Sequence, residues 1–242
     1  LYRSRREARA GFGDTGRALR FAIPHSLAVS FFPDWWRRQP QHDDLTATVV
    51  AADFDGCVEM LLGGACQFLL CYRHEAVPHG LDAHGVRGVQ VGFDRLVPVS
   101  ACDVDGQVLF DLAGATRAVT PLLAYTRNSF LGRVASVLHA QLEGYAQVTL
   151  RYESALVEAL KAEALLGEGV AWLPEAMIGS ELRAGTLQIV GDASLIAPLS
   201  IWLCWPATSG AAANDPALRF WNDACAGDAR GERSVCMTSD AL

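Results

Sequence analysis

The sequence predicts an α/β protein with two lobes, each built around a parallel sheet covered by helices. Apolar runs of strand length alternate with amphipathic runs of helix length. This alternation occurs in two series, one before residue 73 and one after residue 121, separated by a polar stretch with several glycines and histidines. With 51% hydrophobic and 19% charged residues among 242, the composition is that of an ordinary globular protein and not of a disordered chain.

The first series forms a βαβαβ pattern. Pro24 ends its first strand, Ser26 stands at the expected N-cap of the following helix, and Gly63 and Gly64 are expected to stop the second helix. The run at 45–52 is rich in β-branched residues, which favours a strand buried on both faces. The expected elements are strands at 19–23, 45–52 and 66–72, with helices from Leu27 and at 57–62.

The second series repeats the pattern after an extended crossing segment at 88–101. Its expected elements are strands at 121–125, 146–152 and 170–173, helices at 129–143 and 154–166, and a short helix ending at Ala184; a long apolar strand at 195–205 then returns to the first lobe, followed by a helix at 216–225. The predicted divisions are 1–16, the end of a helix; 17–98, the first lobe; 99–196, the second lobe; 197–226, the return to the first lobe; and 227–242, a disordered tail.

Charge and cysteine content restrict the class of partner and compartment. The net charge of −7 gives these residues no general affinity for nucleic acid, and no apolar run is long enough to span a bilayer. The seven cysteines show no disulfide framework or metal-binding spacing, which favours a reducing, cytoplasmic location. We expect no metal, cofactor or membrane partner.

Polar residues follow the predicted strands where each strand ends. Ligands of open α/β sheets bind beyond the carboxyl ends of the strands, so two lobes predict a cleft between those ends. Three of these polar residues are serines, Ser26, Ser129 and Ser154, and each lies at the start of a predicted helix. Their hydroxyls and the free backbone N–H groups there favour a polar or anionic ligand. The candidate ligand-binding residues are Pro24, His25, Ser26, Cys71, Thr126, Arg127, Ser129 and Ser154.

Each candidate also has a purely structural interpretation. The serines suit simple N-caps, Arg127 suits a surface ion pair, His25 a turn residue and Cys71 a buried strand residue. A thiol exposed in a cleft would also provide a route to oxidant sensing. No dinucleotide-binding glycine motif, phosphate-binding lysine loop, HExxH zinc motif or nucleophile elbow occurs, so we expect no catalytic residues and no enzyme activity.

Two segments resemble a known family. The stretch 19–33 is similar to the opening of the LysR-type effector-binding domain, and 167–174 with 182–187 resembles the late glycine-rich strand and helix of that family. The resemblance implies a periplasmic-binding-protein-like fold of type 2, with two Rossmann-like lobes joined by two crossover segments. The resemblance implies that the ligand contacts of the family fall on Pro24, His25, Ser26, Cys71, Arg127, Ser129 and Ser154.

Three further segments are similar to the hypochlorite-responsive subgroup of this family, namely 125–133, 169–175 and 219–221. Methionine oxidation is implicated in that subgroup. This chain departs from it, since it has only three methionines and carries Leu156 where the subgroup would have one.

The resemblance implies a ligand-controlled transcription regulator that acts as a homodimer or homotetramer. A small-molecule effector would change the geometry of the oligomer, and DNA would bind only through an N-terminal winged helix-turn-helix missing here, with residues 1–16 as the remnant of its linker helix. Trp35, Trp36 and the helix at 129–143 are the interface candidates. Two alternatives stay open: an oxidant-sensing switch acting through cysteine or methionine, and a small-molecule binder unrelated to transcription.

Overall fold

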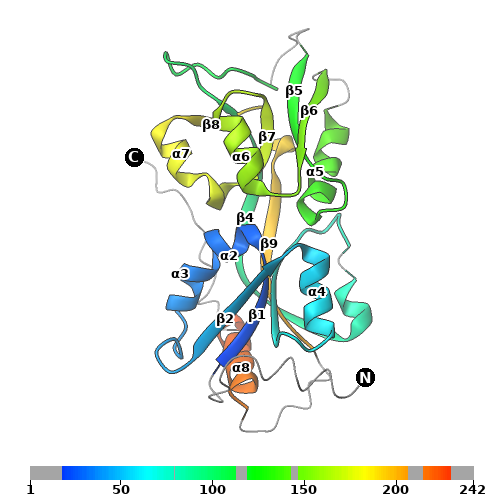
Figure 1. The fold of residues 1–242 in the computed structure, drawn as a ribbon, viewed down its shortest axis with the longest axis vertical. Helices are drawn as coiled ribbons and strands as arrows, with labels where there is room; N and C mark the ends of the chain where they lie inside the picture. Colours follow the sequence, from blue (N-terminus) through cyan, green and yellow to red (C-terminus); the bar gives the residue numbers. More distant parts are fainter. Residues whose placement is uncertain (1–17, 79, 113–118, 143–146, 207–214, 230–242) are drawn as a thin grey trace. The chain divides into compact units, whose positions relative to one another are not determined.

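The computed structural model describes residues 18–78, 80–112, 119–142, 147–206 and 215–229 (Figure 1). The chain divides into two compact units. Unit 1 comprises Leu1–Arg73, His79–Phe93 and Ser200–Leu242, and unit 2 comprises His74–Pro78 and Asp94–Leu199. Two long strands, β4 (Val86–Ala101) and β9 (Ala197–Pro206), each contribute residues to both units. The predicted linker remnant at 1–16 and most of the predicted tail at 227–242 lie outside the described residues.

Unit 1 contains a sheet in which its strands follow the order β2-β1-β3-β9. Strand β1 pairs in parallel with β2 on one side and β3 on the other, and β3 pairs antiparallel with β9. Apart from its parts of β4 and β9, the described elements of unit 1 have the following bounds: β1 (Ala18–Pro24), α2 (His25–Ser30), α3 (Phe32–Arg37), β2 (Thr46–Ala52), α4 (Phe54–Leu62), β3 (Phe68–Arg73), the short 3-10 helix η1 (Leu81–His84) and α8 (Pro216–Ala229).

Strand β2 corrects one expectation. It was expected to be buried on both faces, but all its residues are exposed or half-buried. Among the described residues β2 pairs only with β1, so it forms an edge of the sheet. A β-branched run marks a strand but does not distinguish an edge strand from a central one.

The core of unit 1 is an aromatic cluster around Phe21 on β1. The Phe21 ring lies 5.2 Å from Phe68 and 5.9 Å from Phe220 of α8, between ring centroids. Trp35 and Trp36 also face Phe21, at 6.3 and 5.6 Å, and are only 3% and 8% exposed. The expectation that these tryptophans form an interface is therefore wrong, because they are part of the core of unit 1 itself.

Unit 2 has β5 between two parallel neighbours, β6 and β7. Strand β4 pairs antiparallel with β7 and with the short β8. The elements are β5 (Thr120–Tyr125), α5 (Phe130–Gln141), β6 (Val148–Ser154), α6 (Val157–Leu165), β7 (Val170–Pro174), η2 (Glu175–Met177), α7 (Gly179–Ala184), β8 (Leu187–Ile189) and η3 (Ala193–Leu195).

A tryptophan and a histidine meet in the core of unit 2. Trp172 of β7 is 1% exposed, and its indole N–H donates to the Leu195 carbonyl at 2.9 Å. The imidazole of His139 on α5 packs edge to face against it, 4.7 Å between centroids, and its Nε2 atom has no hydrogen-bond partner among the described residues. Burial lowers the pKa of His139 to about 4. The neutral imidazole thus packs as an apolar ring in this core.

Candidate functional site

In unit 1 the carboxyl end of β1 carries three of the predicted residues. Helix α2 begins directly at His25, and Pro24 is its N-cap with φ −54° and ψ 142°, without any side-chain cap. Ser26 was expected to be the N-cap, but it is the second helical residue, is 5% exposed, and its carbonyl accepts a bond from the Ser30 hydroxyl. A proline side chain has no acceptor atom, so this N-cap residue does not bond the first N–H groups of the helix. His25 is exposed beside them.

At the end of β3, Cys71 points into the core. It is 0% exposed, and its pKa is raised well above the ordinary value, first by a hydrogen bond with the Cys204 thiol and then by burial. Two residues later Arg73 is half-buried, with its guanidinium 4.3 Å from the Trp202 ring centroid and 3.9 Å from the Cys204 Sγ atom. Gly88 provides room for it, since a Cβ there would lie 3.1 Å from the guanidinium. Arg73 thus presents a fixed cation that the candidate list omitted.

In unit 2 three of the predicted residues are joined by hydrogen bonds. The Thr126 N–H donates to the Ser154 carbonyl at 3.2 Å, and the Thr126 carbonyl accepts from both the N–H and the hydroxyl of Ser129. Ser129 is the N-cap of α5, as predicted, because its Oγ accepts from the Gly132 N–H at 3.0 Å. The parallel pairing of β5 with β6 places their carboxyl ends at one edge, which accounts for this cluster.

The side chains of Ser154 and Arg127 do not cap a helix as Ser129 does. Ser154 was expected to begin a helix, but it is the last residue of β6, and its Oγ accepts from the Leu156 N–H at 3.1 Å while α6 begins at Val157. Arg127 is exposed and forms no ion pair with any residue that the structure describes. Its guanidinium is therefore available to an anionic group.

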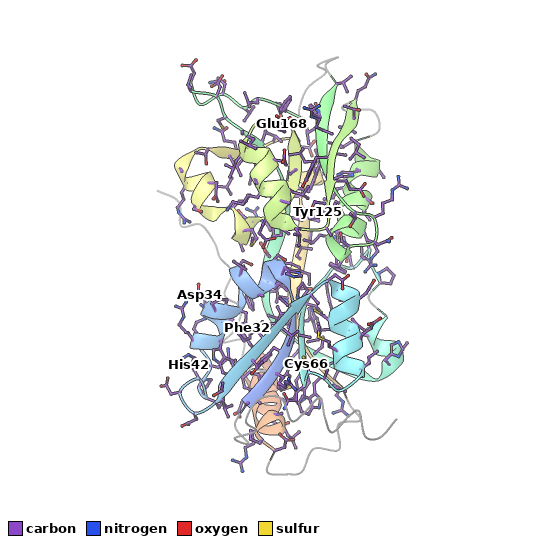
Figure 2. The ribbon with its side chains drawn as sticks, viewed as in Figure 1. Phe32, Asp34, His42, Cys66, Tyr125 and Glu168 are labelled. Atoms are coloured by element: carbon purple, nitrogen blue, oxygen red, sulfur yellow. The ribbon has the colours of Figure 1, made fainter. Side chains whose placement is uncertain are left out.

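Tyr125 is the most informative residue that the sequence-based candidates omit. It is the last residue of β5, is labelled in Figure 2, and is 4% exposed. Its buried hydroxyl has no hydrogen-bond partner among the described residues. Burial raises the pKa of Tyr125 well above its ordinary value, and the negative charges of Glu158 and Asp94 raise it further. An orphaned buried hydroxyl costs stability, so it is a feature to be explained.

Asp94 and Arg95 anchor the beginning of the unit 2 part of β4. The Asp94 Oδ1 atom accepts from the N–H groups of Arg95 at 2.8 Å and Ala176 at 3.2 Å. The Arg95 guanidinium donates two bonds of 2.6 Å to the carboxylate of Glu175, directly after β7. The sequence does hold a signal for this pair, since Asp94 and Arg95 are the only charged residues within the extended segment 88–101.

No group of three or more His, Cys, Asp or Glu side chains suited to a metal ion occurs in the part of the chain that the structure describes. Nor does any helix in that part have the length and apolar character needed to cross a membrane.

Comparison with known proteins decides the family. Residues 13–226 match the family model described as LysR substrate binding domain. The chain belongs to the LysR substrate-binding domain family. The recognition made from the sequence segments is thereby confirmed, and so is the α/β fold of the periplasmic-binding-protein type. A LysR substrate-binding domain is the effector-binding part of a transcriptional regulator.

Two curated relatives come from Escherichia coli. The HTH domain-truncated transcriptional regulator QseD of strain O157:H7 is 30% identical over 219 residues, covering 90% of this chain and 84% of QseD. The HTH-type transcriptional regulator YjiE of strain K12 is also 30% identical, over 90% of this chain and 67% of its own length. Both are named as regulators and neither as an enzyme.

The solved structures include a regulator named as specific for hypochlorite. The apo regulatory domain of HypT from Salmonella typhimurium has a TM-score of 0.74 at 28% identity, covering 88% of this chain and 96% of that one. Full-length HypT, described as a hypochlorite-specific LysR-type transcriptional regulator, gives a TM-score of 0.74, covering 95% of this chain and 74% of that one. The predicted likeness to this subgroup therefore has a counterpart among the solved structures.

Proposed function

We propose that this LysR substrate-binding domain senses a small polar effector through residues at the ends of its strands. The observation that carries the proposal is the bonded cluster of Thr126, Ser129 and Ser154 together with the exposed Arg127, which pairs with no described carboxylate. Helix α5 directs its N-terminal N–H groups to this cluster, and such groups favour a carboxylate or another acceptor. The candidate residues in unit 1 are Pro24, His25, Ser26 and Cys71. We add Arg73, because its guanidinium is held over the Trp202 ring.

Within this proposal the candidates differ in role. Arg127 and His25 are exposed and can bond the effector directly. The Ser129 hydroxyl already donates to the Thr126 carbonyl and accepts from the Gly132 N–H. It would therefore stabilise the turn before α5 as well as contact the effector. Cys71 is completely buried and would act only by holding the end of β3 in place.

Thermal melting against a panel of small carboxylates, inorganic anions and polar neutral compounds tests the proposal. A ligand that binds only the folded state raises stability by about 2.7 kcal/mol at a hundred times its Kd. We expect at least one carboxylate to raise Tm, and Arg127→Ala to abolish the rise. Arg183→Ala, an exposed arginine on α7 of the same unit, is the matched control and should leave it unchanged. A panel without any stabilising compound, or a rise that survives Arg127→Ala, would contradict the proposal.

We further propose that the effector acts by changing the geometry of a homodimer or homotetramer, and that DNA binds through an N-terminal winged helix-turn-helix. Strand β6 supports a contact between copies, because among the described residues it pairs only with β5. Its alternating side chains Val148, Leu150 and Tyr152 are 36%, 58% and 37% exposed. Such an apolar edge usually needs a partner. Light scattering on Leu150→Asp is expected to show a smaller species than the native chain; an unchanged mass would contradict the interface.

An oxidant-sensing switch is the second candidate function, favoured by the likeness to the hypochlorite-specific regulator. Burial raises the pKa of Cys57 to about 12 and also that of Cys66, so both thiols are poor nucleophiles. Among the described residues, the half-buried sulfur side chains Met60, Cys102, Met177 and Cys225 are the more accessible targets. Mass spectrometry after mild hypochlorite would support this candidate if one of these four reacts first and Tm changes with it. Uniform slow oxidation would contradict it.

A further inference from the structure

We propose that Tyr125, Glu158 and Asp94 form a subsite of unit 2 that binds an ammonium or guanidinium group of the effector. The inference rests on the proposed effector-sensing function and narrows the chemical class of the effector. It concerns residues of unit 2 alone.

The three residues meet at one edge of the unit 2 sheet. Tyr125 ends β5, and β7 runs parallel to β5, so both strands end at the same edge. Strand β4 pairs antiparallel with β7, Leu96 opposite Pro174, which places Asp94 just beyond the carboxyl end of β7. Glu158 is the second residue of α6, which follows the parallel strand β6 and packs on β5 and β7. The topology thus gathers a phenol and two carboxylates from three separate elements.

The carboxylates of Glu158 and Asp94 favour a cation beside the Tyr125 hydroxyl, whereas Arg127 after the same strand favours an anion. Glu158 forms neither a hydrogen bond nor an ion pair with any described residue, whereas Lys161 on the same helix is already paired with Glu181 at 2.7 Å. The Asp94 carboxylate is held in place by two backbone N–H groups. Both negative charges act on the Tyr125 hydroxyl. An anionic group placed here would be repelled, while an ammonium group has three donors to offer.

The Tyr125 hydroxyl supplies the independent indication of a ligand. It is buried without a hydrogen-bond partner among the described residues, although nearly all buried polar groups have one. A donor from an ammonium or guanidinium group would satisfy its lone pairs while bonding Glu158. Arg127, two residues after Tyr125, would bond a carboxylate. Together, Arg127 and the proposed cation subsite suit a small zwitterionic molecule better than a simple anion.

Thermal melting of the whole chain with butylammonium chloride and butylguanidinium chloride tests the subsite, with butanol plus sodium chloride and tetramethylammonium chloride as controls. Butanol lacks the charge, and tetramethylammonium lacks hydrogen-bond donors. We expect a saturable rise in Tm with the two donor cations only. Glu158→Gln should raise the apparent Kd for them at least about tenfold, as expected for loss of a charge-assisted hydrogen bond.

A matched variant separates binding from general electrostatics. Glu163→Gln removes the same charge from the same helix, one turn and a half further along, and should leave the apparent Kd unchanged. Tyr125→Phe should weaken binding while preserving or raising the Tm of the free chain, because the unpartnered hydroxyl is removed. Equal effects of all cations, or equal effects of Glu158→Gln and Glu163→Gln, would overturn the proposal.

The outcome is distinguishable from failure of the proposed function. If carboxylates stabilise the chain through Arg127 but the donor cations do not, the effector-sensing function stands and only the cation subsite is wrong. If neither class stabilises the chain, both proposals fail.

Discussion

Lowering the pH from about 8 to about 5 is expected to destabilise unit 2 through His139. Burial against Trp172 lowers the pKa of this imidazole to about 4 in the folded state, from 6.5 in an unfolded chain. Between those two values the unfolded state binds more protons than the folded state, so the free energy of unfolding falls as the pH falls. The loss begins near pH 6.5 and is complete below pH 4.

The size of the effect follows from the two pKa values. At about pH 5 the unfolded state gains roughly 2 kcal/mol from protonation that the folded state does not gain, and the loss reaches about 3 kcal/mol near pH 4. The measurement is urea unfolding of the native chain and of His139→Leu at several pH values, since leucine is apolar and does not titrate. Carboxylates titrate alike in both proteins and cancel in the difference. Parallel profiles for the two proteins between about pH 7 and 5 would refute the reasoning.

Three further changes test the local arguments. Ser129→Ala removes the N-cap of α5 and is expected to lower the free energy of unfolding in urea by about 1 kcal/mol. Ser136→Ala on the same helix removes a hydroxyl that bonds the Gly132 carbonyl and should lower it less, and equal losses would argue against the cap. Gly132→Ala places a methyl group against the Thr126 carbonyl and 2.8 Å from the Ser129 Oγ atom, so we expect a loss of about 2 kcal/mol or more, and a neutral result would contradict the tight turn. Phe21→Ala should cost about 3–5 kcal/mol because five aromatic rings surround it, and a loss below about 1 kcal/mol would contradict the aromatic core.

The order and type of the main elements could be predicted from periodicity alone. The strands ending at Pro24, Tyr125 and Pro174 were expected within about one residue of where they end, because apolar runs followed by proline or polar residues mark strand ends clearly. Whether a strand lies inside a sheet or at its edge depends on pairing between distant segments. For that reason the exposure of β2 was not predictable from its β-branched residues.

The candidate site was predictable in place but not in detail. Strand-end residues of unit 2 do meet, since Thr126 bonds both Ser129 and Ser154. The predicted capping roles of Ser26 and Ser154 were wrong, because α2 already begins at His25 and the helix after Ser154 starts three residues later. Tyr125 was missed since a tyrosine at a strand end is ordinary in sequence, and only the fold shows its hydroxyl to be buried without a partner.

Amide hydrogen exchange tests the central claim, effector sensing at the strand ends, most directly. The chain would be compared with and without the compound that gives the largest rise in Tm. The proposed function predicts that added protection is concentrated at the backbone N–H groups of residues 25–26 and 125–129 and around Ser154. Protection spread evenly over the chain, or confined to segments away from these strand ends, would contradict it.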